Sequence, residues 1–386
     1  MSILLEPTRV ANMQLSNRFV RSATFDGLST EEGEVTDGSV AVVRELAKGG
    51  VGLIITGFAY VTPRGQALPR QTAACDDRFI PGLRRLAKAV HDQGGRVVLQ
   101  IGDCGSQSVV ARERGYRSLA PSSFTKEWIS GEGEREVTHT EKGTPEHRMN
   151  TAAMEAVGMT EEDILETVAA YGQAARRARG AGFDGVQFHG GRGYLLSQFA
   201  SPATNRREDR WGGPLENRTR FVRSCYRAAR EAVGEDYPIL IKMGVKDQAE
   251  NGLSLPDGVR MARLLADEGV NAIEISEGVE QEPIHHIRTG VDTREKEAYY
   301  LDWAREVRSA VSAPLFLVGG LRSFDLMEEI VGAGVVDCVS LCRPFIREPR
   351  LVAEFRTGRT EPARCISCNG CLKGLREGKL GCIFED

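Results

Sequence analysis

The sequence predicts an α/β fold, a (β/α)8 TIM barrel, with a short C-terminal cysteine-rich extension. Three observations predict the barrel. Eight short apolar runs recur along the chain, and being nearly continuous rather than alternating they suit strands buried on both faces. A helical pattern follows each run, and no break in composition divides the series. Such a series favours a closed barrel over a doubly wound sheet.

The predicted strands lie at residues 18–23, 52–56, 96–101, 185–189, 238–244, 272–277, 314–320 and 336–342. Two connecting helices carry clear boundary signals: Thr160 caps a helix that ends at Gly180, and Leu255 opens one that ends near Gly269. Residues 102–158, which contain Gly-Glu-Gly-Glu at 131–134, do not fit the repeat. We expect this long excursion to form a lid or a binding loop.

The composition is that of a globular protein, 41% hydrophobic and 27% charged, which excludes a disordered or collagen-like chain. Fifty basic residues oppose 54 acidic ones without a basic stripe, so no nucleic-acid partner is expected. The sequence has no run of 18 apolar residues and no signal peptide, so we expect a cytoplasmic protein without a membrane partner. The predicted division is a barrel at residues 1–360 and a cysteine-rich tail at 361–386.

Working residues of such a barrel lie where its strands end, so those ends indicate the site. The ends carry, in order, Ser22, Ala23 and Thr24; Gly57; Gln100; His189 to Tyr194; Lys242; Glu277; Gly319 and Gly320; and Cys342 and Arg343. Gly-Gly after strand seven and Arg after strand eight form the usual phosphate cradle of bare N–H groups and a cation, although Gly-Gly alone also suits a tight turn.

A phosphate-anchored cofactor would then lie across the barrel mouth. Ala23 and Gly57 are small enough for a flat ring to approach the backbone. The amide of Gln100 can donate and accept together, which suits the mixed polar edge of a flavin or a nucleobase. Lys242 adds a fixed positive charge. Each residue alone is commonplace, and their succession at neighbouring strand ends carries the prediction.

Two longer motifs go further. The segment Phe-Asp-Gly-Val-Gln-Phe-His at 183–189, continuing through Gly193, Tyr194 and Ser-Gln-Phe at 197–199, resembles the old yellow enzyme family of FMN-dependent NADH:flavin oxidoreductases. So does Asn-Arg-Arg-Glu-Asp-Arg-Trp-Gly-Gly-Pro-Leu-Glu-Asn-Arg at 205–218. The likeness runs from Leu-Glu-Pro at 5–7 to Arg343 and Pro344, and the layout is closest to the barrel of 2,4-dienoyl-CoA reductase and trimethylamine dehydrogenase.

The resemblance implies an FMN site and a hydride-transfer reaction. The implied FMN residues are Ser22, Ala23, Thr24, Gly57, Gln100, Lys242, Gly319, Gly320, Cys342 and Arg343. Reduced flavin would give hydride to the activated alkene of a small-molecule substrate, an enone, unsaturated acid or thioester. His189 would hold the substrate oxygen and Tyr194 would protonate the α-carbon. NAD(P)H or an external electron-donor protein would supply the electrons, and a homo-oligomer is implied.

Arg192 departs from the family pattern, which usually has His or Asn there as the second oxygen donor. Its charge and forked donors suit a carboxylate, so the substrate would carry more negative charge than a simple enone. In the competing interpretation Arg192 swings away and activity on standard enones is weak. Lys242 stands where many relatives carry Arg, Phe25 where some carry a redox-active Cys, and Asp103 where His is common.

The tail holds Cys365, Cys368, Cys371 and Cys382, a pattern whose first three spacings resemble an iron–sulfur run. Three interpretations remain open: a [4Fe–4S] cluster fed by a partner, a structural zinc site, or no metal. Three functional alternatives to the reductase also remain. They are a dehydrogenase or demethylase taking hydride from substrate, a Schiff-base lyase using Lys242, and a partner-binding barrel without catalysis.

Overall fold

A computed structural model of the chain describes residues 2–108, 110–125, 155–280, 287–375 and 378–384. Eight parallel strands form the centre: β3 (Phe19–Arg21), β4 (Leu53–Ile55), β6 (Val97–Gly102), β10 (Gly185–Gly190), β11 (Ile239–Gly244), β12 (Ala272–Ser276), β13 (Leu315–Val318) and β14 (Cys338–Leu341). They pair in this order and the ring closes because β14 also pairs with β3, where Ser340 lies opposite Val20. The predicted (β/α)8 barrel is confirmed, and each predicted run coincides with one of these strands, although β6 and β10 each extend one residue beyond the predicted end.

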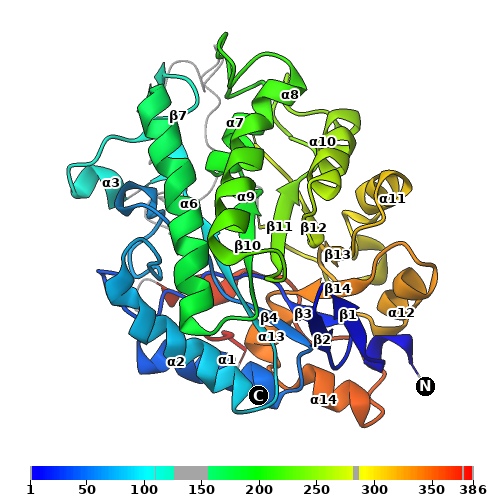
Figure 1. The fold of residues 1–386 in the computed structure, drawn as a ribbon. Helices are drawn as coiled ribbons and strands as arrows, with labels where there is room; N and C mark the ends of the chain where they lie inside the picture. Colours follow the sequence, from blue (N-terminus) through cyan, green and yellow to red (C-terminus); the bar gives the residue numbers. More distant parts are fainter. Residues whose placement is uncertain (1, 109, 126–154, 281–286, 376–377, 385–386) are drawn as a thin grey trace, which may run out of the picture.

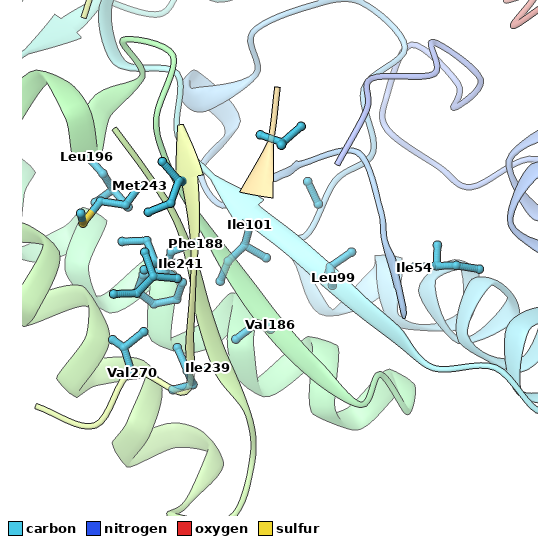
Figure 2. Close-up of a cluster of buried hydrophobic side chains, with 14 of the residues drawn as sticks. Ile54, Leu99, Ile101, Val186, Phe188, Leu196, Ile239, Ile241, Met243 and Val270 are labelled. Carbon is cyan, nitrogen blue, oxygen red and sulfur yellow. The ribbon is translucent and has the colours of Figure 1, made fainter. Parts of the chain in front are cut away.

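Helices surround the strands (Figure 1): α1 (Asp37–Lys48), α2 (Ile80–His91), α6 (Glu161–Ala181), α9 (Arg220–Val233), α10 (Leu255–Asp267), α11 (Leu301–Ala310), α12 (Phe324–Gly332) and α14 (Leu351–Arg356). Alternate strand residues point outward against them, and Figure 2 shows such side chains, Val186 and Phe188 of β10 beside Ile241 of β11. The capping box predicted at Thr160 is present, and α6 ends one residue beyond Gly180.

The amino-terminal end of the barrel is closed by an apolar plug. The hairpin of β1 (Thr8–Val10) and β2 (Met13–Leu15) lays Val10, Met13 and Leu15 against inward-facing side chains of the barrel, Val20, Leu53, Ile55, Val98, Leu240, Ala272, Phe316 and Cys338. These side chains are buried, so the barrel centre at that end is apolar among the described residues. A polar ligand is therefore expected at the opposite, carboxyl end.

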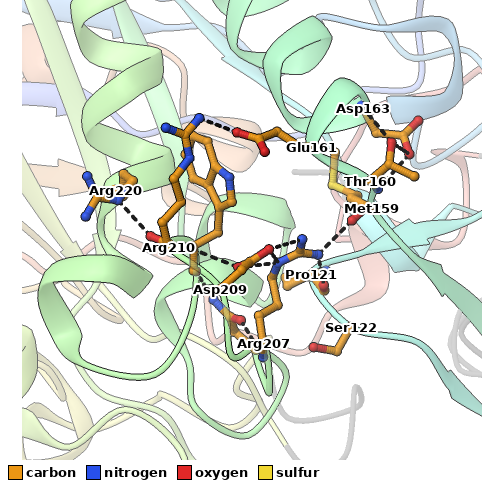
Figure 3. A network of polar contacts seen from close by, with 12 residues as sticks. Pro121, Ser122, Met159, Thr160, Glu161, Asp163, Arg207, Asp209, Arg210 and Arg220 are labelled. Carbon is orange, nitrogen blue, oxygen red and sulfur yellow. Dashed lines mark hydrogen bonds and ion pairs between the residues drawn. The ribbon is translucent and has the colours of Figure 1, made fainter.

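The excursion after β6 is described only in part, and residues 131–134 lie outside the described residues. Its described ends form a small sheet of β7 (Leu119–Ala120), β8 (Phe124–Thr125) and β9 (Glu155–Gly158). The motif at 205–218 holds this sheet in place (Figure 3). Arg207 Nη1 donates to the carbonyls of Pro121 at 2.8 Å and Met159 at 2.7 Å, and Arg207 Nη2 lies 2.6 Å from Asp209 Oδ2. This motif therefore has a structural role.

The last strand is followed by α13 (Pro344–Arg347) and α14, and the chain then returns along the barrel mouth. Ser367 accepts a hydrogen bond at its carbonyl from Gly290 N at 3.2 Å, and Ala363 N donates to Arg322 O at 3.0 Å. The tail thus packs on loops that follow β12 and β13. None of the helices in the described ranges has the length and hydropathy needed to cross a membrane.

Candidate active site at the carboxyl end of the barrel

The strand-end residues predicted from the sequence converge at the carboxyl end, and strand register brings several side by side. His189 lies opposite Lys242 where β10 pairs with β11, and Lys242 lies opposite Glu274 where β11 pairs with β12. Because these inward positions alternate with outward apolar ones, all three side chains face the barrel interior. The structure thus places polar groups directly above the apolar plug.

A buried chain of polar contacts crosses this layer. Gln100 Nε2 donates to Gln187 Oε1 at 2.6 Å, and Gln187 Nε2 donates to Glu274 Oε2 at 3.0 Å. Lys242 Nζ lies 3.7 Å from Glu274 Oε1 and donates to Ser22 Oγ at 2.8 Å. All five residues are buried. These contacts join three predicted residues, Ser22, Gln100 and Lys242. The two residues that connect them, Gln187 and Glu274, were not predicted as site residues.

The backbone at Gly319 and Gly320 requires glycine. Their φ angles are 146° and 74°, and a Cβ on Gly320 would lie 2.8 Å from Val291 Cγ1. The ring of Tyr299 lies beside both residues, and the backbone N–H of Tyr299 donates to Gly319 O at 3.2 Å. The predicted Gly-Gly turn is therefore present and packs against Tyr299 and Val291.

Arg343 follows β14 and is held by the tail. Its Nη1 donates to Asn369 Oδ1 at 2.6 Å and to Arg288 O at 2.8 Å, and Asn369 Nδ2 donates to Ile287 O at 2.9 Å. Asn369 has a φ of 60°, a left-handed conformation that asparagine tolerates better than most residues. A tail residue therefore fixes the predicted phosphate-binding cation.

The first two strand ends pack on one another. A Cβ on Gly57 would lie 2.7 Å from Thr24 O, so glycine here makes room for the neighbouring backbone. Thr24 Oγ1 accepts a hydrogen bond from Arg21 and donates to Ser22 O at 3.1 Å. Ala23 packs at the edge of the apolar plug. Packing between the two strand ends therefore also requires small residues there, in addition to the predicted approach of a flat ring.

Cys342 ends the eighth strand among cations. Burial raises the pKa of its thiol, but Lys242 and Arg21 outweigh burial, and the pKa lies below its usual value. The end of the eighth strand is consequently a positive environment, which favours a bound anion.

His189 and Tyr194, the predicted oxygen donor and proton donor, are in ring contact. Their centroids are 4.8 Å apart with planes at 89°, and Phe58 packs against both, at 5.2 Å from His189 and 5.0 Å from Tyr194. A Cβ on Gly102 would lie 3.1 Å from the Cβ of His189, so the glycine permits this packing. Phe58 was missed because no motif marks an aromatic residue in a loop.

Tyr194 stays protonated at neutral pH. Burial raises its pKa well above the usual value of about 10, and Cys104 raises it further against the opposing charge of Arg192. Its loop is firmly held, because Gln107 Nε2 and Gln198 Nε2 both donate to Gly193 O, at 2.8 and 2.7 Å. A protonated phenol on a fixed loop can act as a proton donor.

Arg192 is paired within the site. It has a φ of 59°, an uncommon conformation for a non-glycine residue, and its N–H donates to Glu277 O at 2.9 Å. Its Nη1 lies 3.6 Å from Glu277 Oε1, and Tyr300 donates to Glu277 Oε2 at 2.8 Å. Arg288 Nη2 lies 4.0 Å from the same oxygen. Glu277, predicted only as a strand end, is therefore an anchor for two arginines.

Asp103, for which the sequence offered no role, stabilises the turn after β6. It accepts hydrogen bonds from Thr62 Oγ1 at 2.6 Å and Gly105 N at 2.9 Å. Burial raises the pKa of its carboxyl group, which these hydrogen bonds oppose. Its role is structural.

The four tail cysteines are partly exposed thiols, and burial raises the pKa of Cys365 and Cys371. Within the part of the chain that the structure describes, which includes all four, no three His, Cys, Asp or Glu side chains form a group that could hold a metal ion. Neither a cluster nor a zinc site is therefore shown by this arrangement of the thiols.

Two surface hollows lie at the other end of the barrel. One, of about 360 Å³, is lined by residues that precede β6, β10 and β11, including Arg96, Asp184 and Tyr237. The other, of about 560 Å³, lies around Asn271 and Pro314, which precede β12 and β13. Neither contains a predicted site residue, and chemistry in this fold occurs at the carboxyl end.

Comparison with known proteins identifies the family. The model of the NADH:flavin oxidoreductase / NADH oxidase family matches residues 3–361. The chain belongs to this family. The resemblance to old yellow enzymes drawn from the motifs is thereby confirmed at family level.

Among curated relatives, a metal reductase of Desulforamulus reducens is 36% identical over 388 residues, covering 100% of this chain and 54% of the relative. An NADH oxidase of Thermoanaerobacter brockii is 33% identical, covering 96% of this chain and 54% of the relative. The chain thus spans about half the length of these relatives. A solved 2-naphthoyl-CoA reductase complex has a TM-score of 0.85 at 26% identity, covering 98% of this chain and 56% of that one.

The barrel mouth fits FMN, the cofactor that the family implies. The Gly319–Gly320 turn after β13 and the cation of Arg343 after β14, two strands that pair with each other, suit a phosphate. The donors Ser22, Gln100 and Lys242, buried at the centre of the mouth, suit the polar edge of the ring system. The set of residues therefore matches both ends of the cofactor.

Proposed function

We propose that the protein is an FMN-dependent oxidoreductase that reduces an activated C=C bond, with electrons supplied by NAD(P)H. Bound FMN would accept two electrons and pass them to the substrate as hydride. The observation that carries the proposal is the contact of His189 with Tyr194 at the mouth, beside the Lys242 and Gln100 donors. This contact supports the proposal that His189 is the oxygen donor and Tyr194 the proton donor.

The two residues have separate tasks. His189, 7% exposed and wedged between Phe58 and Tyr194, would donate a hydrogen bond to the substrate oxygen and stabilise the charge that develops there. Tyr194 would give its phenol proton to the α-carbon, and its raised pKa keeps that proton in place until the reaction requires it. The buried rings would also exclude water from the reacting carbons.

Arg192 indicates an unsaturated acid as the substrate. Its guanidinium is 20% exposed, and although Glu277 offsets part of its charge, Arg288 adds a second cation to the same carboxylate. A substrate carboxylate could bind such a pair through charge-assisted hydrogen bonds. A neutral enone would leave the two cations with Glu277 as their shared carboxylate partner and would add no second anion.

The lyase alternative is not supported by the environment of Lys242. A Schiff-base lysine must present a neutral amine, which requires a lowered pKa. Here Lys242 Nζ lies 3.7 Å from Glu274 Oε1 and donates to Ser22 Oγ at 2.8 Å, so buried partners already engage it. Lys242 is better suited to stabilising negative charge on a bound cofactor.

The test is anaerobic turnover. FMN-loaded protein is reduced with NADH or NADPH and mixed with matched pairs of α,β-unsaturated acids and ketones, and the saturated products are identified. The proposal predicts saturated product with one alkene reduced per NAD(P)H consumed. Flavin that is reduced but is reoxidised by none of the alkenes would contradict it.

A further inference from the structure

The interior of the barrel contains a buried negative charge that the proposed reaction does not use. Glu274, in the middle of β12, is fully buried, and it is not one of the side chains that form the apolar plug below it. Burying a carboxylate is strongly unfavourable unless it is paired. A charge placed at that cost beneath the cofactor site calls for an explanation.

Glu274 contacts Lys242, one of the residues expected to hold the flavin, and reaches a second, Gln100, through Gln187. Its Oε1 lies 3.7 Å from Lys242 Nζ, and its Oε2 accepts from Gln187 Nε2 at 3.0 Å. Gln187 Oε1 in turn accepts from Gln100 Nε2 at 2.6 Å. One N–H of the Gln100 amide is thereby committed, so the orientation of that amide toward the mouth is set from below.

We infer that Glu274 and Gln187 form a positioning relay, in which Gln187 orients Gln100 while Glu274 holds Lys242 and offsets its charge, lowering the reduction potential of the bound flavin. The inference rests on the proposed FMN site. Two-electron reduction adds negative charge to a flavin, which a nearby cation stabilises. A carboxylate behind that cation weakens the stabilisation, because charges interact strongly where water is excluded. The device makes the reduced flavin a stronger hydride donor.

The test compares Glu274→Gln with the wild-type protein, both loaded with FMN, by titrating FMN binding and measuring the midpoint potential spectroscopically. The variant is expected to favour reduced over oxidised flavin by about tenfold, which is about 30 mV upward for a two-electron couple. The matched control is Glu268→Gln, because Glu268 pairs with Arg223 and Arg227 outside the barrel, at the end of α10. The control is expected to keep the wild-type potential.

A second set of variants covers the case in which Glu274→Gln does not fold. Lys242→Met leaves Glu274 unpaired and should lower the potential, whereas Lys242→Met with Glu274→Met removes both charges and should raise it again. Replacing a whole buried pair by apolar residues is often neutral for stability. Gln187→Leu keeps both charges, so it should weaken FMN binding by about tenfold with little change in potential.

Two results would overturn the inference. One is an unchanged potential in a Glu274→Gln protein that binds FMN. The other is equal potentials in the single Lys242 variant and the double variant. Wild-type protein that fails to bind FMN would instead contradict the proposed function, so the two failures are distinguishable.

Discussion

Arg192 and Tyr194 lie two residues apart on one loop and divide the recognition and proton-transfer tasks of the proposed reaction. Tyr194 contacts His189, while Arg192 turns to Glu277 through a left-handed backbone conformation. Strand-end positions made His189, Arg192 and Tyr194 predictable from sequence. Glu277 as the anchor of Arg192 was not, because a side-chain partner from another strand depends on register and rotamer.

Removal of the Tyr194 phenol should slow proton transfer specifically. Tyr194→Phe is expected to lower the rate of alkene reduction by about 10²- to 10⁴-fold while NAD(P)H still reduces the flavin. Because the pKa of Tyr194 is raised, the wild-type rate should fall only above about pH 10. Stopped-flow measurement of the two half-reactions across pH checks both points. Equal slowing of both half-reactions would contradict this role.

Exchange of the Arg192 charge should change substrate preference. Arg192→His is expected to lower kcat/KM for an unsaturated acid by about 10- to 100-fold relative to the matched ketone, because a charge-assisted contact is worth about 1.5–3 kcal/mol. The measurement is the ratio of the two kcat/KM values in each protein. An acid-to-ketone ratio that is the same in both proteins would exclude a carboxylate role for Arg192.

The elements around the mouth are held by buried side-chain to backbone contacts. The loop after β11 is fastened by Asp247, whose Oδ2 accepts from Leu253 N at 2.6 Å and Oδ1 from Val279 N at 2.7 Å. The strands were predictable because each is a short, nearly continuous apolar run. Their inward-facing residues were predictable because side chains alternate between the two faces of a strand. Loop anchors such as Asp247 and the clamp of Arg207 have no periodic signal, so the sequence marks them only as motif residues.

Asp247 should make stability depend on pH. Burial raises its pKa to about 6 in the folded chain, although two backbone hydrogen bonds lower it. The folded state therefore binds this proton more tightly than the unfolded state, and the stabilisation, present below about pH 4, is lost as the pH rises through about 6. Relative to Asp247→Asn, the wild-type protein should lose about 3 kcal/mol between these limits.

Urea unfolding of the wild-type protein and Asp247→Asn at several pH values gives this difference directly. As the pH rises from about 4 to about 8, the free energy of unfolding of the wild-type protein should fall relative to that of Asp247→Asn, because only the wild-type protein has this carboxyl group to titrate. A difference that stays constant between about pH 4 and about pH 8 would show that Asp247 has an ordinary pKa.

Arg207 should be needed to hold the small sheet over the barrel. Arg207→Ala is expected to cost about 2–3 kcal/mol of unfolding free energy, because it leaves two carbonyls and Asp209 without their charged donor. Arg206→Ala is the matched control, since Arg206 is exposed and donates to Ser123 O at 3.2 Å. Chemical denaturation measures both, and equal costs in the two variants would refute the clamp.

At the scale of the whole molecule, the barrel and the tail share one site. The barrel was predictable from eight repeated runs, whereas the position of the tail was not, because Cys, Gly and Lys residues carry no structural period. In the structure the tail reaches the mouth and Asn369 fixes Arg343. Contacts between the barrel and the tail thus cross the division that composition suggests.

Asn369 should therefore affect cofactor binding without contacting the ring system. Asn369→Ala is expected to raise the dissociation constant of FMN by about tenfold, because Arg343 loses a partner that orients it. The control is Asn12→Ala, which removes an amide that donates to Asp236 O at 2.7 Å at the opposite end of the barrel. Fluorescence titration of FMN measures both variants. Unaltered binding in Asn369→Ala would mean that the tail does not support the phosphate site.

The most direct test of the account is the visible spectrum of the full chain after loading with FMN, recorded before and after anaerobic addition of NADH or NADPH. The account predicts one FMN bound per chain, bleaching of the oxidised flavin band by the nicotinamide, and recovery of the band when an unsaturated acid is added. A protein that retains no FMN, or whose bound FMN is reduced by neither nicotinamide, would contradict it.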